Sequence, residues 1–480
     1  MTPTVESNVS CTVAAISRFS PARPAPSGPV PLTFQQEFMF RHLMQPEVAT
    51  PVSNAFRLRG SLNIEVLCKS LSLVIARNES LRTRIVCVDG VQRQLVDEPG
   101  IVELKVLHFS GASTADIEAD VRRFLQKFVW RRLELTTGPL FDMRVLQIAD
   151  RDYVLALVLH HLITDATSFN LLLREIWSSY SAFARGQHPN LPAVSIQYPD
   201  YALWQRNEHG RWLKKHESYW SKRLADAVSA KLPRDDGLER VSPHKVSIID
   251  MPFEQLSGRL HELARHLRTS TAIVLLALYT IVLARWSGQS DFVLPYVVSG
   301  RLGSMDLNVM GYVGQFLLLR MELQGDATFI DMITLVTREF FGAYEHLDFG
   351  KVIHTHPEIL AGVSLNGLIG TMDALSLTEL NSGSGVIAVE TFPMMEEEMA
   401  APEEFRHPSE VYCLLWSTTE GIHARCMYRA DLFNPQTINC FLEDFRSFAQ
   451  QVAQDPTRRI ASLRGWRHTD GDHAQMLPAR

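Results

Sequence analysis

Hydrophobic and polar residues follow two different periods along this chain, and the change of period is clearest near its first third. Residues 153–159 are a continuous apolar run rich in β-forming side chains, which predicts a buried strand. From 167 to 184 apolar residues recur at helical spacing, and Asp165 lies in the cap cluster before them. The pattern therefore predicts a strand, a short turn and a helix, and the turn carries His160, His161 and Asp165.

The same two periods recur along the rest of the chain. In the first half, strands are expected at 54–59, 79–87, 91–96 and 141–148, and helices at 31–41, 63–77 and 114–133. In the second half, helices are expected at 253–267, 271–285, 329–345 and 435–452, and strands at 292–298, 316–323, 386–391, 411–416 and 422–428. Strands interleaved with helices in both halves indicate an α/β protein.

Length and local composition divide the chain into parts. At 480 residues it is longer than a single hydrophobic core usually accommodates, so two lobes are expected. Ser, Pro and Ala dominate the first thirty residues, which indicates a disordered leader. The division that we expect is a leader at 1–30, an N-terminal lobe at 31–190, a linker region with a polar helix at 191–245, a C-terminal lobe at 246–465 and a flexible tail at 466–480.

Charge and cysteine content argue against several classes of protein. The formal net charge of −6 gives no support for nucleic-acid binding, which usually needs a basic domain. The longest apolar run, 271–284, is shorter than the roughly 20 residues of a membrane span, so no membrane partner is expected. The six cysteines show no paired spacing, which indicates neither a zinc site nor a disulfide scaffold and fits a reducing cytoplasm.

The candidate chemistry lies in the turn with the two histidines. A neutral imidazole can accept a proton from an attacking amine or alcohol near neutral pH. Because His160 and His161 are consecutive at a strand end, they point opposite ways, and we expect one to be chemical and the other structural. Asp165 could orient the ring directly, or it could pair with a distant cation and hold the loop. A hydrogen-bonded histidine pair without any catalytic role is a third interpretation.

Other motifs of known chemistry are absent or incomplete. The chain has no G-x-S-x-G, no G-x-G-x-x-G and no P-loop, so it shows no sign of a nucleophile of that type, a dinucleotide or ATP. His354 and His356 lack a third ligand at a suitable spacing, so no metal site is expected. The Asp-Phe-Gly at 348–350 lacks the accompanying kinase motifs. A histidine base without a nucleophile or cofactor indicates direct transfer between two bound substrates.

Eight stretches of this sequence resemble, in family order, the motifs of condensation domains of nonribosomal peptide synthetases. The turn at 160–166 resembles the signature His-His-x-x-x-Asp-Gly, with Ala166 in place of Gly. The other similar stretches are 31–36, 77–83, 198–204, 299–301, 310–320, 346–349 and 428–433. Within 310–320, Gln315 and Phe316 replace the central Asn-Thr of the family motif.

The resemblance implies a fold and an active site. The family fold is a pseudo-dimer of two chloramphenicol-acetyltransferase-like lobes, which form a V with a central tunnel between them. By resemblance, the catalytic group is His161, in a motif with His160 and Asp165, and it orients or deprotonates the acceptor. Asp165 is then structural and pairs with Arg301, because a buried carboxylate needs such a partner. The amide of Ala166, at a helix start, would supply partial positive charge near the developing oxyanion.

The resemblance also implies a function and its partners. Tyr198, Trp204, Gln315 and Phe316 are expected to line the substrate tunnel. The expected reaction transfers an acyl thioester from the phosphopantetheine arm of an acyl or peptidyl carrier protein to an amine or hydroxyl acceptor, either a small molecule or carrier-bound. No permanently bound cofactor is expected. Because the chain has no adenylation motif and no carrier motif, we expect a free-standing enzyme that acts in trans in nonribosomal peptide or polyketide-hybrid biosynthesis.

Two alternatives compete with this interpretation. An acyltransferase of the same superfamily that uses acyl-CoA would employ His161 and Asp165 in the same way. A catalytically silent relative would only recruit partner proteins, but such relatives usually lack the second histidine, which is present here as His161.

Overall fold

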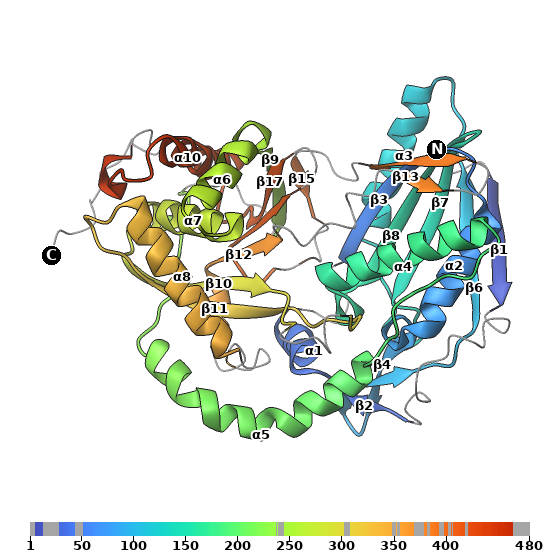
Figure 1. Ribbon diagram of the computed structural model, residues 1–480, viewed down its shortest axis with the longest axis horizontal. Helices are drawn as coiled ribbons and strands as arrows, with labels where there is room; N and C mark the ends of the chain where they lie inside the picture. Colours follow the sequence, from blue (N-terminus) through green and yellow to red (C-terminus); the bar gives the residue numbers. More distant parts are fainter. Residues whose placement is uncertain are drawn as a thin grey trace.

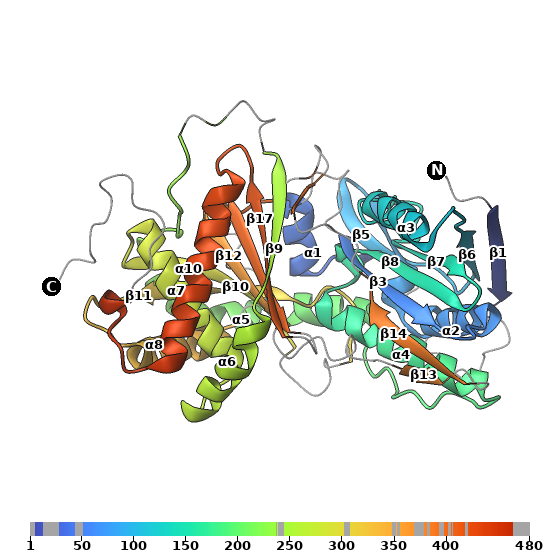
Figure 2. The ribbon, with the colours of Figure 1, turned by 90° about the horizontal axis from the view of Figure 1, so that it is seen from above.

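The structure, a computed structural model, shows two lobes side by side (Figures 1 and 2). It describes residues 5–12, 28–43, 51–236, 238, 244–301, 308–347, 352, 356–368, 379–381, 385–392, 398–401, 405, 407–417 and 421–463. Each lobe is built on a seven-stranded sheet, and a separate three-stranded sheet accompanies the first lobe. This arrangement confirms the two-lobed α/β architecture that the sequence predicts.

The sheet of the first lobe has the strand order β1-β6-β7-β8-β3-β14-β13. Its strands are β1 (Val5–Thr12), β3 (Pro51–Arg59), β6 (Ile101–His108), β7 (Phe141–Ala149), β8 (Asp152–His160), β13 (Glu379–Asn381) and β14 (Val386–Thr391). The helices of this lobe are α1 (Phe34–Phe38), α2 (Ile64–Arg77), α3 (Thr114–Phe128) and α4 (Ala166–Ala184). The small sheet consists of β2 (Val30–Pro31), β4 (Thr83–Val88) and β5 (Val91–Val96).

Strand β8 lies in the middle of the first sheet, between β7 and β3. Leu155, Leu157 and Leu159 belong to the core cluster that includes residues of α2 and α4, whereas Val154 and Val158 belong to the cluster on α3. Both faces of the strand are therefore covered, which explains why its sequence is apolar without alternation. The central position makes the end of β8 a rigid support for the turn that follows.

The sheet of the second lobe has the strand order β11-β10-β12-β16-β17-β9-β15. Its strands are β9 (Val246–Pro252), β10 (Asp291–Val298), β11 (Gln315–Glu322), β12 (Val363–Leu368), β15 (Glu398–Ala400), β16 (Val411–Ser417) and β17 (Ile422–Arg429). Its helices are α6 (Glu254–His266), α7 (Thr271–Ser287), α8 (Phe329–Glu345) and α10 (Pro435–Gln454). These helices lie on the side of the sheet away from the first lobe (Figure 2).

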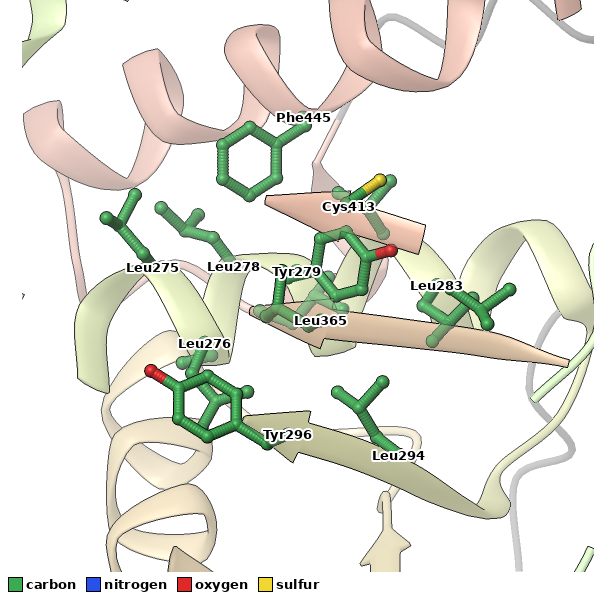
Figure 3. Packing of buried hydrophobic residues seen from close by; sticks show 14 of the residues in the cluster. Leu275, Leu276, Leu278, Tyr279, Leu283, Leu294, Tyr296, Leu365, Cys413 and Phe445 are labelled. Carbon is green, nitrogen blue, oxygen red and sulfur yellow. The ribbon is translucent and has the colours of Figure 1, made fainter. Parts of the chain in front are cut away.

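Helix α7 forms the centre of the second core. Its side chains are buried nearly all round, and Tyr279 lies between Leu365 of β12 and Phe445 of α10 (Figure 3). A helix that is apolar on every side is typical of a fully buried core helix. Among the described residues, no single helix has the length and apolar character to cross a membrane; only the sharply bent pair 256–266 and 271–287 passes such a test when taken together.

Helix α5 (Tyr198–Arg223) connects the two lobes along one side of the molecule (Figure 1). Tyr198 and Tyr201 in its first turn are part of the first core, whereas Trp220 near its end is part of the second. The 26-residue helix is polar on average, although buried residues such as Gln205 and His216 also lie between its two ends.

One strand crosses from the second half of the sequence into the first lobe, and this corrects the predicted division. We expected 386–391 in the C-terminal lobe at 246–465, but β14 pairs antiparallel with β3, and β13 extends the same sheet. Ile387 is fully buried in the first core. The next strand, β15, pairs with β9 of the second sheet. The chain therefore enters the first lobe and returns, a long-range pairing that no local pattern encodes.

A second correction concerns the first thirty residues. We expected a disordered leader at 1–30, but Val5–Thr12 forms β1 and pairs along its whole length with β6. The strand carries few apolar side chains, and its backbone pairs with β6 at the edge of the sheet. The prediction rested on amino-acid composition, which indicates whether a segment can bury apolar side chains. It gives no information about backbone pairing, so this strand was missed.

The cysteines provide a third correction. Cys413 on β16 and Cys426 on β17 lie directly opposite each other and form a disulfide. Their spacing along the sequence gave no sign of this bond, because it follows from the register of two antiparallel strands. A cytoplasmic location stays a prediction.

Candidate active site

The turn between β8 and α4 has the predicted strand–turn–helix form. Strand β8 ends at His160, a 3-10 turn follows at His161–Ile163, and α4 begins at Ala166 with Asp165 as its cap. The amide of Leu162 donates to Nδ1 of His160 at 3.1 Å. Burial lowers the pKa of His160 to about 3, and the neighbouring His161 acts in the same direction. His160 is thus a neutral, buried acceptor that holds the turn in shape.

His161 differs from His160 in its surroundings. The residue keeps part of its surface exposed, although its Nδ1 atom is buried. Its ring packs edge-on against Tyr312, with 4.6 Å between the ring centroids. Burial lowers the pKa of His161, while its own backbone, Asp165 and Thr164 act in the opposite direction. The imidazole is therefore neutral at neutral pH, which is the protonation state that a general base needs.

Both carboxylate oxygens of Asp165 are occupied by partners other than the histidines. Oδ2 accepts from Nη1 of Arg301 at 2.9 Å and from the amides of Val313 and Gly314 at 3.0 and 2.9 Å. Oδ1 accepts from Nη2 of Arg301 at 3.2 Å and from the amide of Ser168 at 2.7 Å. Burial alone would raise the pKa of Asp165, but Arg301 and Ser168 outweigh it and hold the pKa below its usual range. Asp165 pairs with a distant cation and does not orient the ring.

Arg301 and Ser168 extend this contact between the lobes. Nη2 of Arg301 also donates to Oγ of Ser168 at 2.8 Å and to the carbonyl of Val309 at 3.0 Å. Oγ of Ser168 donates to the carbonyl of Gly311 at 2.6 Å and lies 2.9 Å from its amide, which donates to it. The start of α4 is therefore hydrogen-bonded to the loop at 308–314 of the second lobe. Sequence reasoning missed Ser168; its place three residues after the Asp165 cap was the available signal.

Tyr198 is a buried support for the same loop, and its predicted part in lining the tunnel stays a prediction. Its hydroxyl donates to the carbonyl of Tyr312 at 2.7 Å and lies 3.0 Å from Oγ1 of Thr33. A Cβ at Gly311 would lie 2.1 Å from the Tyr198 ring, so only glycine fits there. Tyr198 therefore fixes the backbone of Tyr312, whose ring contacts His161.

The other residues predicted for the tunnel lie elsewhere in the described structure. Trp204 is 46% exposed on α5 and packs on Tyr201. Phe316 is partly buried and packs against Phe38, and Gln315 is buried at the start of β11. The ring contacts of Trp204 with Tyr201 and of Phe316 with Phe38 do not involve His161. The part of Trp204, Phe316 and Gln315 in a tunnel stays a prediction.

The remaining predicted features have mixed outcomes. Ala166, partly exposed, is the first residue of α4, so its amide lies in the helix turn whose N–H groups have no partner within the helix. Within the described part of the chain, no three His, Cys, Asp or Glu side chains gather as they would around a metal ion. Residues 348–350 and His354 lie outside the described residues.

The family follows from a comparison with known protein families. The model of the condensation domain matches residues 27–472, which is nearly the whole chain. This chain belongs to the condensation domain family. The resemblance drawn from the eight motifs is thereby confirmed.

Known proteins align with this chain over most of its length. A linear gramicidin synthase protein from Brevibacillus parabrevis is 29% identical over 93% of this chain, which spans only 6% of that much longer protein. The SgcC5 protein of Streptomyces globisporus has a similar structure, with a TM-score of 0.73 at 23% identity over 89% of this chain and 100% of the other. The X-domain from teicoplanin biosynthesis also has a TM-score of 0.73, at 21% identity over 93% of this chain and 99% of the other. The expected chloramphenicol-acetyltransferase-like pseudo-dimer is thus confirmed as the fold.

Proposed function

We propose that this condensation domain transfers an acyl group from a carrier-bound thioester to an amine or hydroxyl acceptor. The observation that carries the proposal is His161, a partly exposed residue at the boundary of the lobes whose imidazole has a lowered pKa. Both carboxylate oxygens of its motif partner Asp165 are already bound, by Arg301 and two amides of the other lobe and by the amide of Ser168. His161 is thus a neutral base, and Asp165 only holds the surrounding backbone in place. This arrangement suits a reaction without a covalent enzyme intermediate.

The chemistry needs only groups that this chain supplies. Nε2 of His161 takes the proton of the acceptor N–H or O–H as the acceptor lone pair bonds to the thioester carbonyl carbon. The carbonyl becomes an oxyanion, for which the N–H groups at the start of α4, beginning with Ala166, offer partial positive charge. When the carbonyl re-forms, the C–S bond breaks, and the leaving thiolate takes up the proton from His161.

The partners follow from this chemistry. The phosphopantetheine arm of a carrier protein would deliver the donor, and no resident cofactor is needed. We further propose that carriers are accepted in trans. The acceptor class is open because Gln315 and Phe316 depart from the family motif. The SgcC5 structure contains a naphthyl-ethanediol, so alcohols belong beside amines among the acceptors to be tried.

The experiment is a transfer assay on the whole chain. Carrier proteins loaded with a range of acyl groups are incubated with the protein and with amines, alcohols or a second loaded carrier. Intact-mass analysis then follows loss of the acyl group from the donor and gain by the acceptor. We expect transfer that depends on the protein and is lost with His161→Ala. Transfer from acyl-CoA at an equal rate would instead favour the CoA-dependent alternative.

The non-catalytic alternative has one structural observation in its favour. The X-domain from teicoplanin biosynthesis shares this fold and also has a structure in complex with OxyB. That likeness concerns the fold only, and the neutral His161 favours catalysis. Absence of transfer with every donor and acceptor, from a folded protein, would favour the recruiting function.

A further inference from the structure

Gln36 in the short helix α1 is fully buried and makes two kinds of hydrogen bond. In a capping box with Thr33, its backbone N–H donates to the Thr33 hydroxyl at 3.1 Å and its Oε1 accepts from the Thr33 amide at 3.0 Å. Its Nε2 donates to the carbonyl of Leu162 at 2.8 Å and lies 3.3 Å from Oε1 of Gln94. A residue 126 positions before Leu162 in the sequence therefore holds the histidine turn directly.

Leu162 is the residue after His161, and side chains hold both of its backbone groups. Its N–H donates to Nδ1 of His160, and its carbonyl accepts from Gln36. These two bonds fix the peptide planes on either side of Leu162. Because the direction of a side chain follows from its backbone, they also restrict where the His161 ring points.

The choice of glutamine over glutamate at this position has a physical reason. A capping box accepts either Glu or Gln at its third position, because only the side-chain oxygen is used. The amide of Gln36 can in addition donate to Leu162, whereas an ionised carboxylate would place an acceptor against that carbonyl. The helix cap therefore does not require an amide, whereas the turn that carries His161 does.

The same helix cap also supports the other side of the His161 ring. Oγ1 of Thr33 lies 3.0 Å from the hydroxyl of Tyr198, which donates to the carbonyl of Tyr312 at 2.7 Å. The rings of Tyr312 and His161 lie 4.6 Å apart. Helix α1, which lies between the lobes in Figure 2, is thus connected to both partners of this ring contact.

We propose that Gln36 is a positioning residue, whose amide sets the direction of the His161 ring through the Leu162 carbonyl. The inference rests on the proposed function of His161 as the base. It assigns to α1 a role in catalysis that acts through the histidine turn.

A matched pair of variants tells whether Gln36 positions the His161 ring or only stabilises helix α1. Gln36→Glu keeps the acceptor of the capping box and the side-chain volume but removes the donor to Leu162. Gln205→Glu makes the same change at a second fully buried glutamine, which accepts from the amide of Phe34 and donates to Gln35, both at 2.8 Å. Gln205 anchors α1 to α5 without touching the histidine turn. If either carboxylate prevents folding, Gln36→Met and Gln205→Met replace the pair.

The measurements are thermal unfolding, kcat and KM in the transfer assay, and the ring resonances of labelled histidine, with His161 assigned by His161→Gln. We expect similar losses of stability in both variants. Only Gln36→Glu should lower kcat, by roughly ten- to a hundred-fold because the base is misplaced, with KM changed less than about three-fold. Only Gln36→Glu should shift the His161 resonance.

Two results would overturn the inference: equal loss of kcat in both variants, or an unshifted His161 resonance in folded Gln36→Glu. If the wild-type protein itself transfers nothing, the proposed function fails, and the resonance still decides whether Gln36 orients the ring. The two failures are therefore distinguishable.

Discussion

His161 and Asp165 lie four residues apart and have opposite electrostatic surroundings. Nothing compensates fully for the burial of His161, so its pKa falls, whereas Arg301 and Ser168 overcome the burial of Asp165. The imidazole is therefore neutral at neutral pH, with one ring nitrogen free of a proton, whereas the carboxylate stays charged and fixed. The motif identified both residues, but the partners of Asp165 come largely from a loop that is distant in the sequence and could not be derived from local sequence.

The lowered pKa of His161 has a measurable consequence for the pH dependence of catalysis. A general base works when neutral, so kcat/KM should stay constant as the pH falls from neutrality and decline only near the lowered pKa. We expect the midpoint of the acid limb below 6.5, the ordinary value for histidine. Intrinsic fluorescence over the same range checks that the protein stays folded. An acid limb centred at or above 6.5 would show that burial does not control this group.

The loop at 308–314 is the element that joins the site to the second lobe, and its glycines offer a test. Gly311→Ala would place a methyl group 2.1 Å from the Tyr198 ring, so the loop or the ring must move. We expect a loss of about 1–3 kcal/mol in unfolding free energy, the usual cost of overpacking, together with reduced activity.

Gly314→Ala is the control for this substitution. Its added methyl would find its nearest neighbour at 3.5 Å, an ordinary contact, and its amide would still donate to Asp165. Chemical unfolding and the transfer assay compare the two variants. Equal effects from both would mean that the Tyr198 contact does not decide the shape of the loop.

Local patterns predicted the strongly periodic elements and failed where pairing partners lie far away. The expected helices at 63–77 and 271–285 correspond closely to α2 and α7. The helix expected at 114–133 ends earlier, at Phe128. Nothing in the sequence marked this end, because no Gly or Pro follows Phe128 before residue 133. Strands β6, β9 and β12 were missed: the first two mix charged with apolar residues, and the third is short and contains Gly367.

Three of the connections between the lobes within the described residues are helix α5, the loop at 308–314, and the pair β13 and β14. Only the first follows from a contiguous sequence pattern, the polar helical stretch that begins at Tyr198. The other two depend on contacts between distant residues, among them the deeply buried ion pair of Asp165 and Arg301. The relative position of the lobes is therefore a property of tertiary packing.

Removing Arg301 tests how strongly this ion pair couples the lobes. Arg301→Met leaves the buried carboxylate of Asp165 without its cation, so we expect a loss of about 3–5 kcal/mol in unfolding free energy. Adding Asp165→Asn removes the unpaired charge, and the double variant should lose less than the sum of the single variants. Chemical unfolding of all four proteins measures the coupling. Strictly additive losses would argue against a direct interaction.

The proposed chemistry depends on a single imidazole, and a single-turnover experiment tests it. An acyl-loaded carrier is mixed with excess protein and acceptor, and acyl transfer is followed by intact mass for the wild type and for His161→Ala, each shown to be folded. We expect the variant to be slower by about 10²- to 10⁴-fold, the usual contribution of a general base. Equal rates for the two proteins would contradict the assignment of His161 as the catalytic residue.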